Sequence, residues 1–401
     1  MELKEYRFDE VTINFDKKRV PLSGAQREKR QGKYRYYGAQ GVIDHIDDYI
    51  FDGAYLLIAE DGENLKSKKQ NIAQVVEGQF WVNNHAHIVQ GNELCDTRYL
   101  CYLLNSMDLS GYVTGSAQPK LSQANLNAVT LFLPSISIQK KIVEYLYMFD
   151  KKIAVNQQIN DNLEQQAVVL FRSWFSTFSL SPNSPRVNSE FGEIPEDFAV
   201  VKVGSLPMLV TDYVANGSFA SLKANVNLYQ EPNYAYFIRN TDLKSGTFGV
   251  FVDQHSYEFL SKSTLYGGEI IISNVGDVGS VFLCPKLDGR MTLGNNIIML
   301  RPEDAHLRYY LYIWFKYLQG QALIQGIKGG SAQPKFNKTD FKNTSVLIPP
   351  KDILTRFHEA VAPMFEMISQ KQIETAHLAD LRDTLLPRLM SGELNVSDID
   401  L

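Results

Sequence analysis

Two long segments of the chain carry apolar residues at alternating spacings of three and four positions, and each begins after a proline. The first covers residues 135–178 and the second covers residues 350–395. So narrow an apolar stripe is typical of a coiled-coil seam, whereas a helix on a globular surface carries a broader one. At 1.5 Å per residue, a helix of about 40 residues is roughly 60 Å long. The pattern therefore predicts two long spacer helices, each needing a partner.

The apolar positions of the two segments correspond one to one at a constant offset of 215 residues (357 − 142, for example). Polar residues interrupt both stripes near the middle, at Asn156 and Asn160 in the first and at Lys371 and Thr375 in the second. Polar seam residues lower stability but fix the register of a coiled coil. We therefore expect the segments to pair with each other rather than to form independent core helices. The residues predicted to pair them are Ile142, Phe149, Ile153, Leu163, Leu170, Trp174, Phe357, Met364, Ile368, Leu378, Leu385 and Leu389.

The six residues GSAQPK occur twice, at 115–120 and at 330–335, with the same offset as the helices. A turn, a short apolar strand and a proline follow each copy, so loop, strand and helix form one duplicated module. Segments rich in aromatic and β-branched residues and glycine precede each loop, which predicts a mixed sheet with many loops. The expected α+β fold has mixed α/β domains at 1–134 and 199–349, long helices at 135–178 and 350–395, and a serine- and proline-rich linker at 179–198.

The composition is that of an ordinary globular protein, because 44% of the 401 residues are hydrophobic and 21% are charged. No apolar run approaches the roughly 20 residues that span a bilayer, and the first residues are charged, so we expect neither membrane insertion nor a signal peptide. Cys95, Cys101 and Cys284 are too widely spaced for a disulfide framework or a zinc ribbon. These features predict a cytoplasmic protein.

The charge pattern contains a local signal that the net charge of −5 hides. Between residues 16 and 35 basic residues are concentrated, and only Asp16 and Glu28 oppose them within that range. Acidic residues at 44–52 are expected to offset the total without touching this face. A basic face is the footprint of a nucleic-acid-binding protein, although a solvated surface is the simpler explanation of charge alone. The candidate phosphate contacts are Lys17, Lys18, Arg19, Arg27, Lys29, Arg30, Lys33 and Arg35.

Familiar catalytic motifs are missing from the sequence. It contains no G-x-x-x-x-G-K-[ST] phosphate loop, no G-x-S-x-G elbow and no H-E-x-x-H. His85 and His87 lie on one face of a predicted strand and could bind a metal, but the matching segment of the second half has no histidine. We therefore expect these histidines to pack or to form hydrogen bonds, and we expect neither a metal site nor a catalytic residue.

A duplicated pair of divergent domains, held apart by helices, suits a target with two half-sites at a fixed spacing, as on DNA. Identical loops would contact phosphates, and divergent domains would recognise different bases. Over nearly its whole length the chain resembles the specificity subunits of type I restriction–modification systems. The likeness rests on YYGAQGVIDHIDDYIFDGAYLLIAEDG, FWVNNHAHIV, GGEIIISNVGDVGSVF, both GSAQPK loops, FGEIPEDF and LLPRLMSGEL. Two features depart from the family pattern, because Phe198 stands where tryptophan is commoner and the first helix ends in LFRSWF.

The resemblance implies a non-catalytic DNA-recognition subunit. It implies that the two helices pair antiparallel, and that each target-recognition domain reads one half of a bipartite, asymmetric site in double-stranded DNA while the helices set the unread spacer. The implied partners are two copies of an adenine-N6 methyltransferase subunit, together with restriction and translocation subunits. Those partners, rather than this chain, would bind S-adenosylmethionine, ATP and Mg²⁺.

Loop and strand residues supply the remaining candidate DNA contacts. For the duplicated loops, a turn that fixes each domain onto its helix is an equally good explanation. In FIRNTD, Arg239 could read guanine bidentately and Asn240 could read adenine, although solvated groups on an edge strand are the simpler explanation. Trp174 and Phe175 are expected to pack rather than to stack on bases. The loop candidates are Ser116, Gln118, Lys120, Ser331, Gln333 and Lys335.

Two other classes of function stay open on the sequence alone. A duplicated scaffold could join other subunits without reading DNA, and the acidic residues at 44–52 could serve a metal-dependent nuclease. The position of the basic run favours DNA contact over the scaffold. Which bases are recognised is not encoded in any pattern of the sequence, because recognition depends on loop geometry and on DNA shape.

Overall fold

The structure is a computed structural model of the chain, and it describes residues 2–67, 70–115, 118–330 and 333–396. The chain divides into two compact units. Unit 1 consists of Met1–Val155 and Glu374–Leu401, and unit 2 consists of Asn156–Ile373. Each unit therefore contains one part of each long helix. Within the described residues, no helix combines the length and the apolar character needed to cross a membrane.

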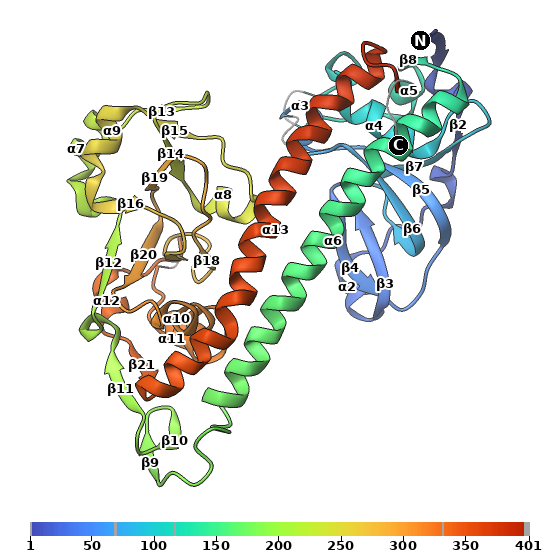
Figure 1. Cartoon of the computed structure of the whole chain (residues 1–401). Helices are drawn as coiled ribbons and strands as arrows, with labels where there is room; N and C mark the ends of the chain where they lie inside the picture. The colour runs from blue at the N-terminus through green and yellow to red at the C-terminus, as the bar shows by residue number, and fades with distance from the viewer. Residues whose placement is uncertain (1, 68–69, 116–117, 331–332, 397–401) are drawn as a thin grey trace. The chain divides into compact units, whose positions relative to one another are not determined.

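Unit 1 contains a mixed sheet, a smaller antiparallel pair and several short helices (Figure 1). Its strands are β1 (Lys4–Arg7), β2 (Thr12–Asn14), β3 (Gln31–Gly38), β4 (Gly41–Ile46), β5 (Phe51–Ala59), β6 (Ala73–Val82), β7 (Ala86–Gly91) and β8 (Thr130–Leu133). Its short helices are α1 (Phe8–Val11), α2 (Gly24–Glu28), α3 (Asn64–Ser67), α4 (Thr97–Ser106) and α5 (Gln123–Asn127). The sheet has the order β2-β7-β5-β6-β3-β4, and β1 pairs with β8. Strands β3 and β6 run parallel, and the other neighbours are antiparallel.

Unit 2 contains two larger sheets, in the orders β12-β20-β17-β18 and β13-β15-β14-β19-β16, and the pairs β9–β10 and β11–β21. Its strands are β9 (Arg186–Ser189), β10 (Gly192–Pro195), β11 (Ala199–Lys202), β12 (Met208–Asp212), β13 (Leu228–Tyr229), β14 (Ala235–Ile238), β15 (Phe251–Val252), β16 (Thr264–Leu265), β17 (Ile270–Ser273), β18 (Val281–Leu283), β19 (Arg290–Leu293), β20 (Ile297–Pro302) and β21 (Ser345–Ile348). Its short helices are α7 (Phe219–Asn225), α8 (Asn240–Ser245), α9 (Gln254–Phe259), α10 (Leu307–Lys316), α11 (Leu318–Gly326) and α12 (Lys338–Lys342).

Both units arrange their central strands in the same way. The parallel pair β3–β6 of unit 1 corresponds to β14–β19 of unit 2, and the antiparallel pair β5–β7 corresponds to β17–β20. Between β16 and β17, Gly267 and Gly268 adopt positive φ angles that favour glycine. The strand that is continuous as β5 in unit 1 is divided there, and the single sheet of unit 1 becomes two sheets in unit 2.

The two long helices are α6 (Ile136–Phe175) and α13 (Lys351–Ser391), and they pair antiparallel (Figure 1). In unit 1 the start of α6 meets the end of α13, where Asp150 accepts a hydrogen bond of 2.6 Å from Arg382. In unit 2 the end of α6 meets the start of α13, where the rings of Phe175 and Phe357 lie 4.9 Å apart. The predicted fold class, two mixed domains with paired long helices, is confirmed.

All twelve residues predicted to pair the helices are buried or half-buried. Further deeply buried positions near the helix ends, however, lie outside the seam pattern. There the helix is surrounded by a domain core rather than by one partner, so its apolar face is wider than a seam. They include Ala167 and Phe171 in α6 and Leu354, Val361 and Phe365 in α13, whereas Phe175, which was expected to pack, is buried.

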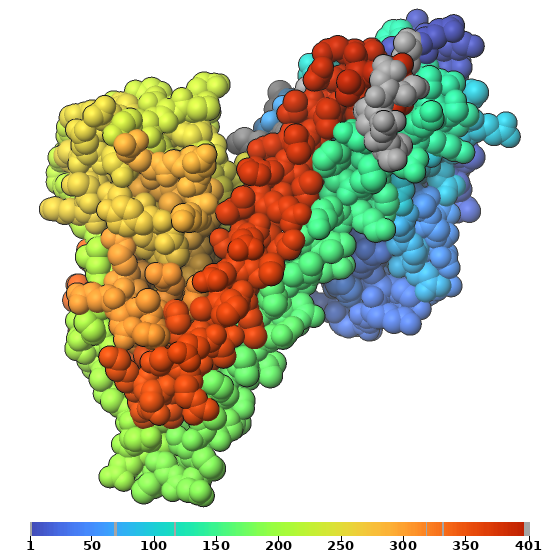
Figure 2. Space-filling view, viewed as in Figure 1, coloured from blue at the N-terminus to red at the C-terminus, as the bar shows by residue number. Residues whose placement is uncertain are grey.

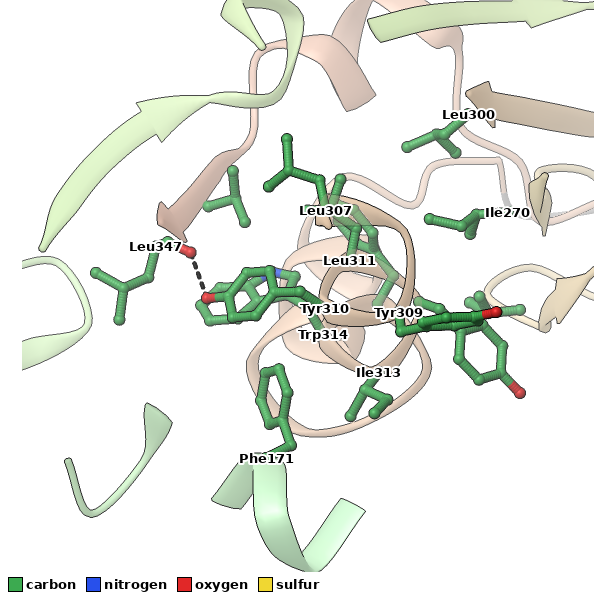
Figure 3. Close-up of a cluster of buried hydrophobic side chains, with 14 of the residues drawn as sticks. Phe171, Ile270, Leu300, Leu307, Tyr309, Tyr310, Leu311, Ile313, Trp314 and Leu347 are labelled. Carbon is green, nitrogen blue, oxygen red and sulfur yellow. Dashed lines mark hydrogen bonds between the residues drawn. The ribbon is translucent and has the colours of Figure 1, made fainter. Parts of the chain in front are cut away.

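The core of unit 2 is centred on α10, whose sequence LRYYLYIWFK is almost entirely buried (Figure 3). The Tyr310 hydroxyl donates a hydrogen bond to the carbonyl of Leu347 in β21, which satisfies the one polar atom of that ring. Trp314 packs edge-on against Phe191, with 5.3 Å between the ring centroids. Phe191 belongs to the segment predicted as a linker, so 179–198 is not a loose connection: its β9–β10 hairpin packs against this core.

Phe175→Ala is expected to lower the free energy of unfolding by about 3–5 kcal/mol, because a ring that is 2% exposed leaves a cavity in the core of unit 2. Urea unfolding followed by tryptophan fluorescence measures this loss. The control Val169→Ala lies on the same helix but is 65% exposed, and it should change the stability by at most about 0.5 kcal/mol. Equal losses in both variants would contradict the packing described here.

Candidate functional site

The duplicated GSAQPK segments form the same closed loop in both units. In unit 1, the backbone N–H and C=O groups of Thr114 and Lys120 exchange two hydrogen bonds of 2.8 Å. In unit 2, Gly329 and Lys335 exchange two bonds of 2.8 and 2.9 Å. Each loop is thus closed by the same pair of backbone hydrogen bonds, and in unit 1 the Thr114 hydroxyl adds a bond of 3.3 Å to the Lys120 carbonyl.

Each loop is also bound to the end of a central strand. In unit 1, the residues after β5 hold the loop from both sides: Gly62 N–H donates to Pro119 C=O at 3.1 Å, and Leu121 N–H donates to Glu60 C=O at 2.8 Å. The loop therefore continues the sheet as a short added segment. Unit 2 repeats both bonds after β17, from Gly276 to Pro334 at 2.8 Å and from Phe336 to Asn274 at 3.0 Å.

A glycine is required at the start of each loop. Gly115 and Gly330 both have a φ angle of 86°, in the left-handed region that favours glycine. A Cβ atom would lie 2.2 Å from the carbonyl oxygen of Gln118 in the first loop and 2.5 Å from that of Gln333 in the second. The repeated glycine therefore has a structural cause that is independent of any ligand.

The remaining loop candidates divide into described and undescribed residues. Gln118, Lys120, Gln333 and Lys335 have exposed side chains. Two further candidates, Ser116 and Ser331, lie outside the described residues. The loop backbone is thus a structural turn, as one of the two sequence explanations expected, while its described polar side chains are accessible to a ligand. Phosphate contact by these side chains stays a prediction.

Backbone hydrogen bonds also align the two units residue by residue around the loops. Glu60 N–H donates to His85 C=O at 2.9 Å, and Asn274 N–H donates to Asn296 C=O at 3.1 Å. Glu60 therefore corresponds to Asn274, and His85 corresponds to Asn296. The registers of the β2–β7 and β12–β20 pairs extend the alignment to Asn14 with Val210 and to His87 with Ile298, and two residues further along the chain Asp16 stands at the position of Asp212.

In unit 1 these positions form a cluster of paired charges. The Arg19 guanidinium lies 3.4 Å from Asp16 and 3.0 Å from Glu60, and it donates to the Ala86 carbonyl at 2.8 Å. Lys120 of the loop reaches the same Glu60 carboxylate at 3.2 Å. The side chains of Arg19 and Glu60 are each only 16% exposed, so solvent screens this pair less than a surface pair. The cluster fills the space between the loop and the strand ends.

A buried histidine, His87, contacts Asp16 of the cluster. His87 Nδ1 lies 2.6 Å from Asp16 Oδ2, and Nε2 lies 2.8 Å from the Leu121 carbonyl oxygen. Because both partners accept hydrogen bonds, both ring nitrogens carry protons. Burial alone would lower the pKa of His87, but the hydrogen bonds to Asp16 and Leu121 outweigh it and raise the pKa. His85 bonds to Asp61 at 2.7 Å, so both histidines form hydrogen bonds, as the sequence predicted.

In unit 2 the corresponding positions are largely uncharged. The retained acid, Asp212, pairs with Lys338 at 3.0 Å instead of with an arginine and a histidine. A cavity of about 730 Å³ lies beside the second loop, and Lys335 contributes to its wall. On its wall, Asn274 stands at the position of Glu60 and Asp212 at the position of Asp16.

The basic run at 17–35 is divided between paired and exposed residues. Arg27 lies 2.9 Å from Asp44, and Arg30 lies 2.8 Å from Asp47. The expectation that the acidic residues at 44–52 do not touch this face is therefore wrong: β4 pairs with β3 and brings them beside the run. With Arg19 also paired, the exposed members of the run are Lys17, Lys18, Lys29, Lys33 and Arg35.

The two candidate base readers in FIRNTD already have partners in unit 2. Arg239 donates from Nε and Nη2 to both carboxylate oxygens of Asp242, at 2.9 and 2.5 Å. A bidentate contact to guanine would require that fork to leave Asp242. Asn240 donates to Asp277 at 3.3 Å. The structure therefore places both residues in the caps of α8 and the neighbouring loop, and base reading by either stays a prediction.

The acidic residues proposed for a nuclease also have partners. Asp44 is paired with Arg27, and Asp52 accepts a hydrogen bond of 3.1 Å from Gln79. In the part of the chain that the structure describes, no three His, Cys, Asp or Glu residues are grouped so that they could hold a metal ion.

Two similar backbone frames with different side chains, joined by paired antiparallel helices, define a duplicated recognition protein. The family model for the type I restriction modification DNA specificity domain matches residues 2–165 and 195–376. The chain therefore belongs to this family, and it is a DNA specificity subunit of a type I restriction–modification system. Specificity subunits are the non-catalytic DNA-recognition components of these systems, and S-adenosylmethionine and ATP belong to the modification and restriction subunits.

Similar proteins cover most of the chain. The specificity subunit of the type I restriction enzyme MjaIX from Methanocaldococcus jannaschii is 29% identical over 76% of this chain and 70% of its own length. A putative specificity subunit of Haemophilus influenzae is 25% identical over 92% of this chain and 89% of its own length. The crystal structure of the S subunit from M. genitalium has the same fold, with a TM-score of 0.54 and 14% identity over 97% of this chain and 96% of that one.

Gly115→Ala and Gly330→Ala are each expected to lower the unfolding free energy by about 1–3 kcal/mol, because alanine is strained at this φ angle and its Cβ meets a carbonyl oxygen. Thermal and urea unfolding measure the loss. Gly111→Ala is the matched control, since nothing lies within 4 Å of its added Cβ and no positive φ is required there. A loss in the control equal to that of the loop variants would refute the assignment of strain to the loop.

Proposed function

We propose that this subunit recognises a bipartite, asymmetric site in double-stranded DNA, with one half-site read by each target-recognition domain. Residues 1–134 and 199–349 are the two recognition domains, 179–198 connects them, and the helices at 135–178 and 350–395 set the unread spacer. The observation that carries the proposal is the duplicated frame: the same loop closure and strand-end bonds recur with different side chains around them. A shared frame supplies the same docking on each half-site, and different side chains supply an asymmetric sequence preference.

Exposed cations beside the frame support contact with the DNA backbone. Unit 1 carries Lys17, Lys18, Lys29 and Lys33 in exposed positions, and the loops add a lysine in each unit. Lysine and arginine contacts to phosphates supply affinity without sequence preference, and they would position each domain on the duplex. The net charge of −5 does not oppose this, because the paired carboxylates near Arg27 and Arg30 are already neutralised.

The outer surfaces of the long helices support the binding of two modification subunits. Figure 2 shows α6 and α13 uncovered along the viewed face. Large exposed apolar patches mark protein–protein interaction sites. Because α6 and α13 are antiparallel and duplicated, one patch on each would bind one methyltransferase copy, and the restriction subunits would join that assembly. The exposed residues are Met148 (48%), Val155 (39%) and Val169 (65%) in α6, and Met367 (42%), Ile373 (42%) and Leu381 (53%) in α13.

Exchange of residues 1–134 for those of another family member should replace one half-site and leave the other half-site unchanged. The measurement is N6-methyladenine mapping in cells that express the full chain with its methyltransferase partner. The matched control is exchange of residues 199–349, which should replace the opposite half-site. If the methylated motif stayed the same after both exchanges, the result would favour a scaffold that does not read DNA.

Insertion of one coiled-coil repeat into both helices should lengthen the unread spacer and preserve both half-sites. The insertions belong after Val155 in α6 and after Ile373 in α13, where the chain passes from one compact unit to the other. The same methylation mapping measures the spacer. Insertion into α6 alone is the control, and it should abolish methylation because the two seams lose their register. An unchanged spacer in the double insertion would contradict the role of the helices as the ruler.

A further inference from the structure

The cavity of about 730 Å³ in unit 2 is bounded by the second GSAQPK loop, the end of β17, the start of β20 and helices α7 and α12. Three kinds of side chain meet on its wall. Asn295 and Asn296 contribute exposed carboxamides, Lys223 and Lys335 contribute exposed ammonium groups, and Phe219 contributes an aromatic ring. The cavity is therefore neither a purely apolar pocket nor a simple charged patch.

In unit 1 the same strand end and loop carry ion pairs. There the Arg19 guanidinium binds Glu60 and the Ala86 carbonyl, and Lys120 binds the same Glu60. In unit 2 a neutral amide, Asn274, occupies the position of Glu60, and the ion pair on the cavity wall is that of Lys338 with Asp212. Two frames with identical loop bonds thus differ most where the loop meets the strand ends. Where the backbone is the same in both units and the side chains differ, those side chains can give the two units different DNA sequence preferences.

The polar groups on the cavity wall are available to a ligand. Among the described residues, the side chains of Asn295 and Asn296 have no hydrogen-bond partner, and Lys223 and Lys335 have no carboxylate within ion-pair distance. The other charges of the wall are satisfied internally. Lys338 pairs with Asp212 at 3.0 Å, and Asp340 accepts a hydrogen bond of 2.7 Å from Asn337. The free charge on this wall is therefore positive.

Phe219 adds an apolar contact to the rim of the cavity. Its side chain is 82% exposed, the largest exposure among the large hydrophobic residues that the structure describes. Ser218 caps the helix that begins with Phe219, accepting a hydrogen bond of 3.2 Å from Ser221 N–H, so the backbone that carries the ring is held in place. A fixed, exposed ring beside free amides and ammonium groups resembles the wall of a ligand site more than a solvated surface.

We propose that this cavity, called the groove below, reads the second half-site. We propose that it recognises at least one A·T base pair through the major groove of the DNA. The proposal rests on the proposed function. Asparagine amides form a bidentate pair with the N6 and N7 atoms of adenine, and an aromatic ring makes an apolar contact with the thymine methyl group. Asn295 or Asn296 makes the first contact and Phe219 makes the second. Lys335 and Lys223 bind the flanking phosphates.

The charge and the polar groups favour duplex DNA over a protein partner as the occupant. Here the unpaired groups are two ammonium groups and two amides, which match the phosphates and the hydrogen-bonding edges of base pairs. Because Arg19 and Lys120 are paired with Glu60 at the corresponding position of unit 1, other residues of that unit would read the first half-site.

The test uses the full chain expressed with its methyltransferase subunit, and it reads the methylated motif by N6-methyladenine mapping. The variants are Asn295→Ala, Asn296→Gly and Phe219→Ala. Glycine is chosen for Asn296 because that residue has a positive φ of 64°. Discrimination at an A·T position of one half-site should fall about 10- to 100-fold, and the other half-site should be unchanged. Lys335→Ala should instead weaken binding of the purified complex evenly across sequences and lower its salt dependence by about one phosphate contact.

Asn188→Ala is the matched control, because it removes an exposed amide in β9 of the same unit without touching the groove. An unchanged motif in every groove variant, while the domain exchanges still replace half-sites, would overturn this proposal and leave the bipartite reading intact. A change confined to the first half-site would also overturn it. Loss of the methyltransferase subunit from purified groove variants, with the motif unaltered, would assign the groove to a protein partner and refute the DNA contact. Phe219→Ala is expected to fold normally, because the exposed ring contributes little to the core, so an effect of this variant on the motif would not be due to misfolding.

Discussion

The packing of helix ends into domain cores is the constraint on which this structure depends. Leu389 and Met390, near the end of α13, are buried in the core of unit 1, whereas Phe171 and Phe175, near the end of α6, are buried in the core of unit 2. Each core therefore contains the end of a long helix whose other end belongs to the other unit. An antiparallel pairing satisfies both cores at once, and a parallel pairing would expose the aromatic and aliphatic ends to water. Domain folding and helix direction are thereby coupled.

The two units keep the same backbone bonds around their loops although their side chains differ. The loop closures and strand-end bonds use backbone groups, which every residue type except proline provides in full. Side chains around them are free to change, from the ion pair of Arg19 and Glu60 in unit 1 to Asn274 at the position of Glu60 in unit 2. The demands on glycine at Gly115 and Gly330 are steric, so those residues stay the same in both copies. Frame and specificity are carried by different parts of the polypeptide.

Electrostatics in unit 1 follow the same division. Two arginines of the basic run at 17–35, Arg27 and Arg30, form ion pairs with nearby aspartates. The buried His87, which is bonded to Asp16, also bonds to the carbonyl of Leu121, the residue that follows the loop. Such pairs organise the surface more than they add to its charge, because each one cancels. The lysines that are left exposed carry the local positive potential. A net charge summed over the chain averages these features away.

The sequence by itself determined the periodic and the duplicated features: the long helices from their spacing, the repeated loop from its identity, and the mixed sheets from their β-branched and glycine-rich segments. These depend on local propensity and on regular burial, which leave a pattern along the chain. Tertiary structure alone decided which charges meet. It brought Asp44 of β4 beside Arg27 of α2, placed Asp16 against His87, widened the seam at Phe171 into a core, and paired Arg19 with Glu60 beside one loop where the other has Asn274. Those outcomes depend on contacts between residues far apart in the chain, and no spacing along the sequence records them.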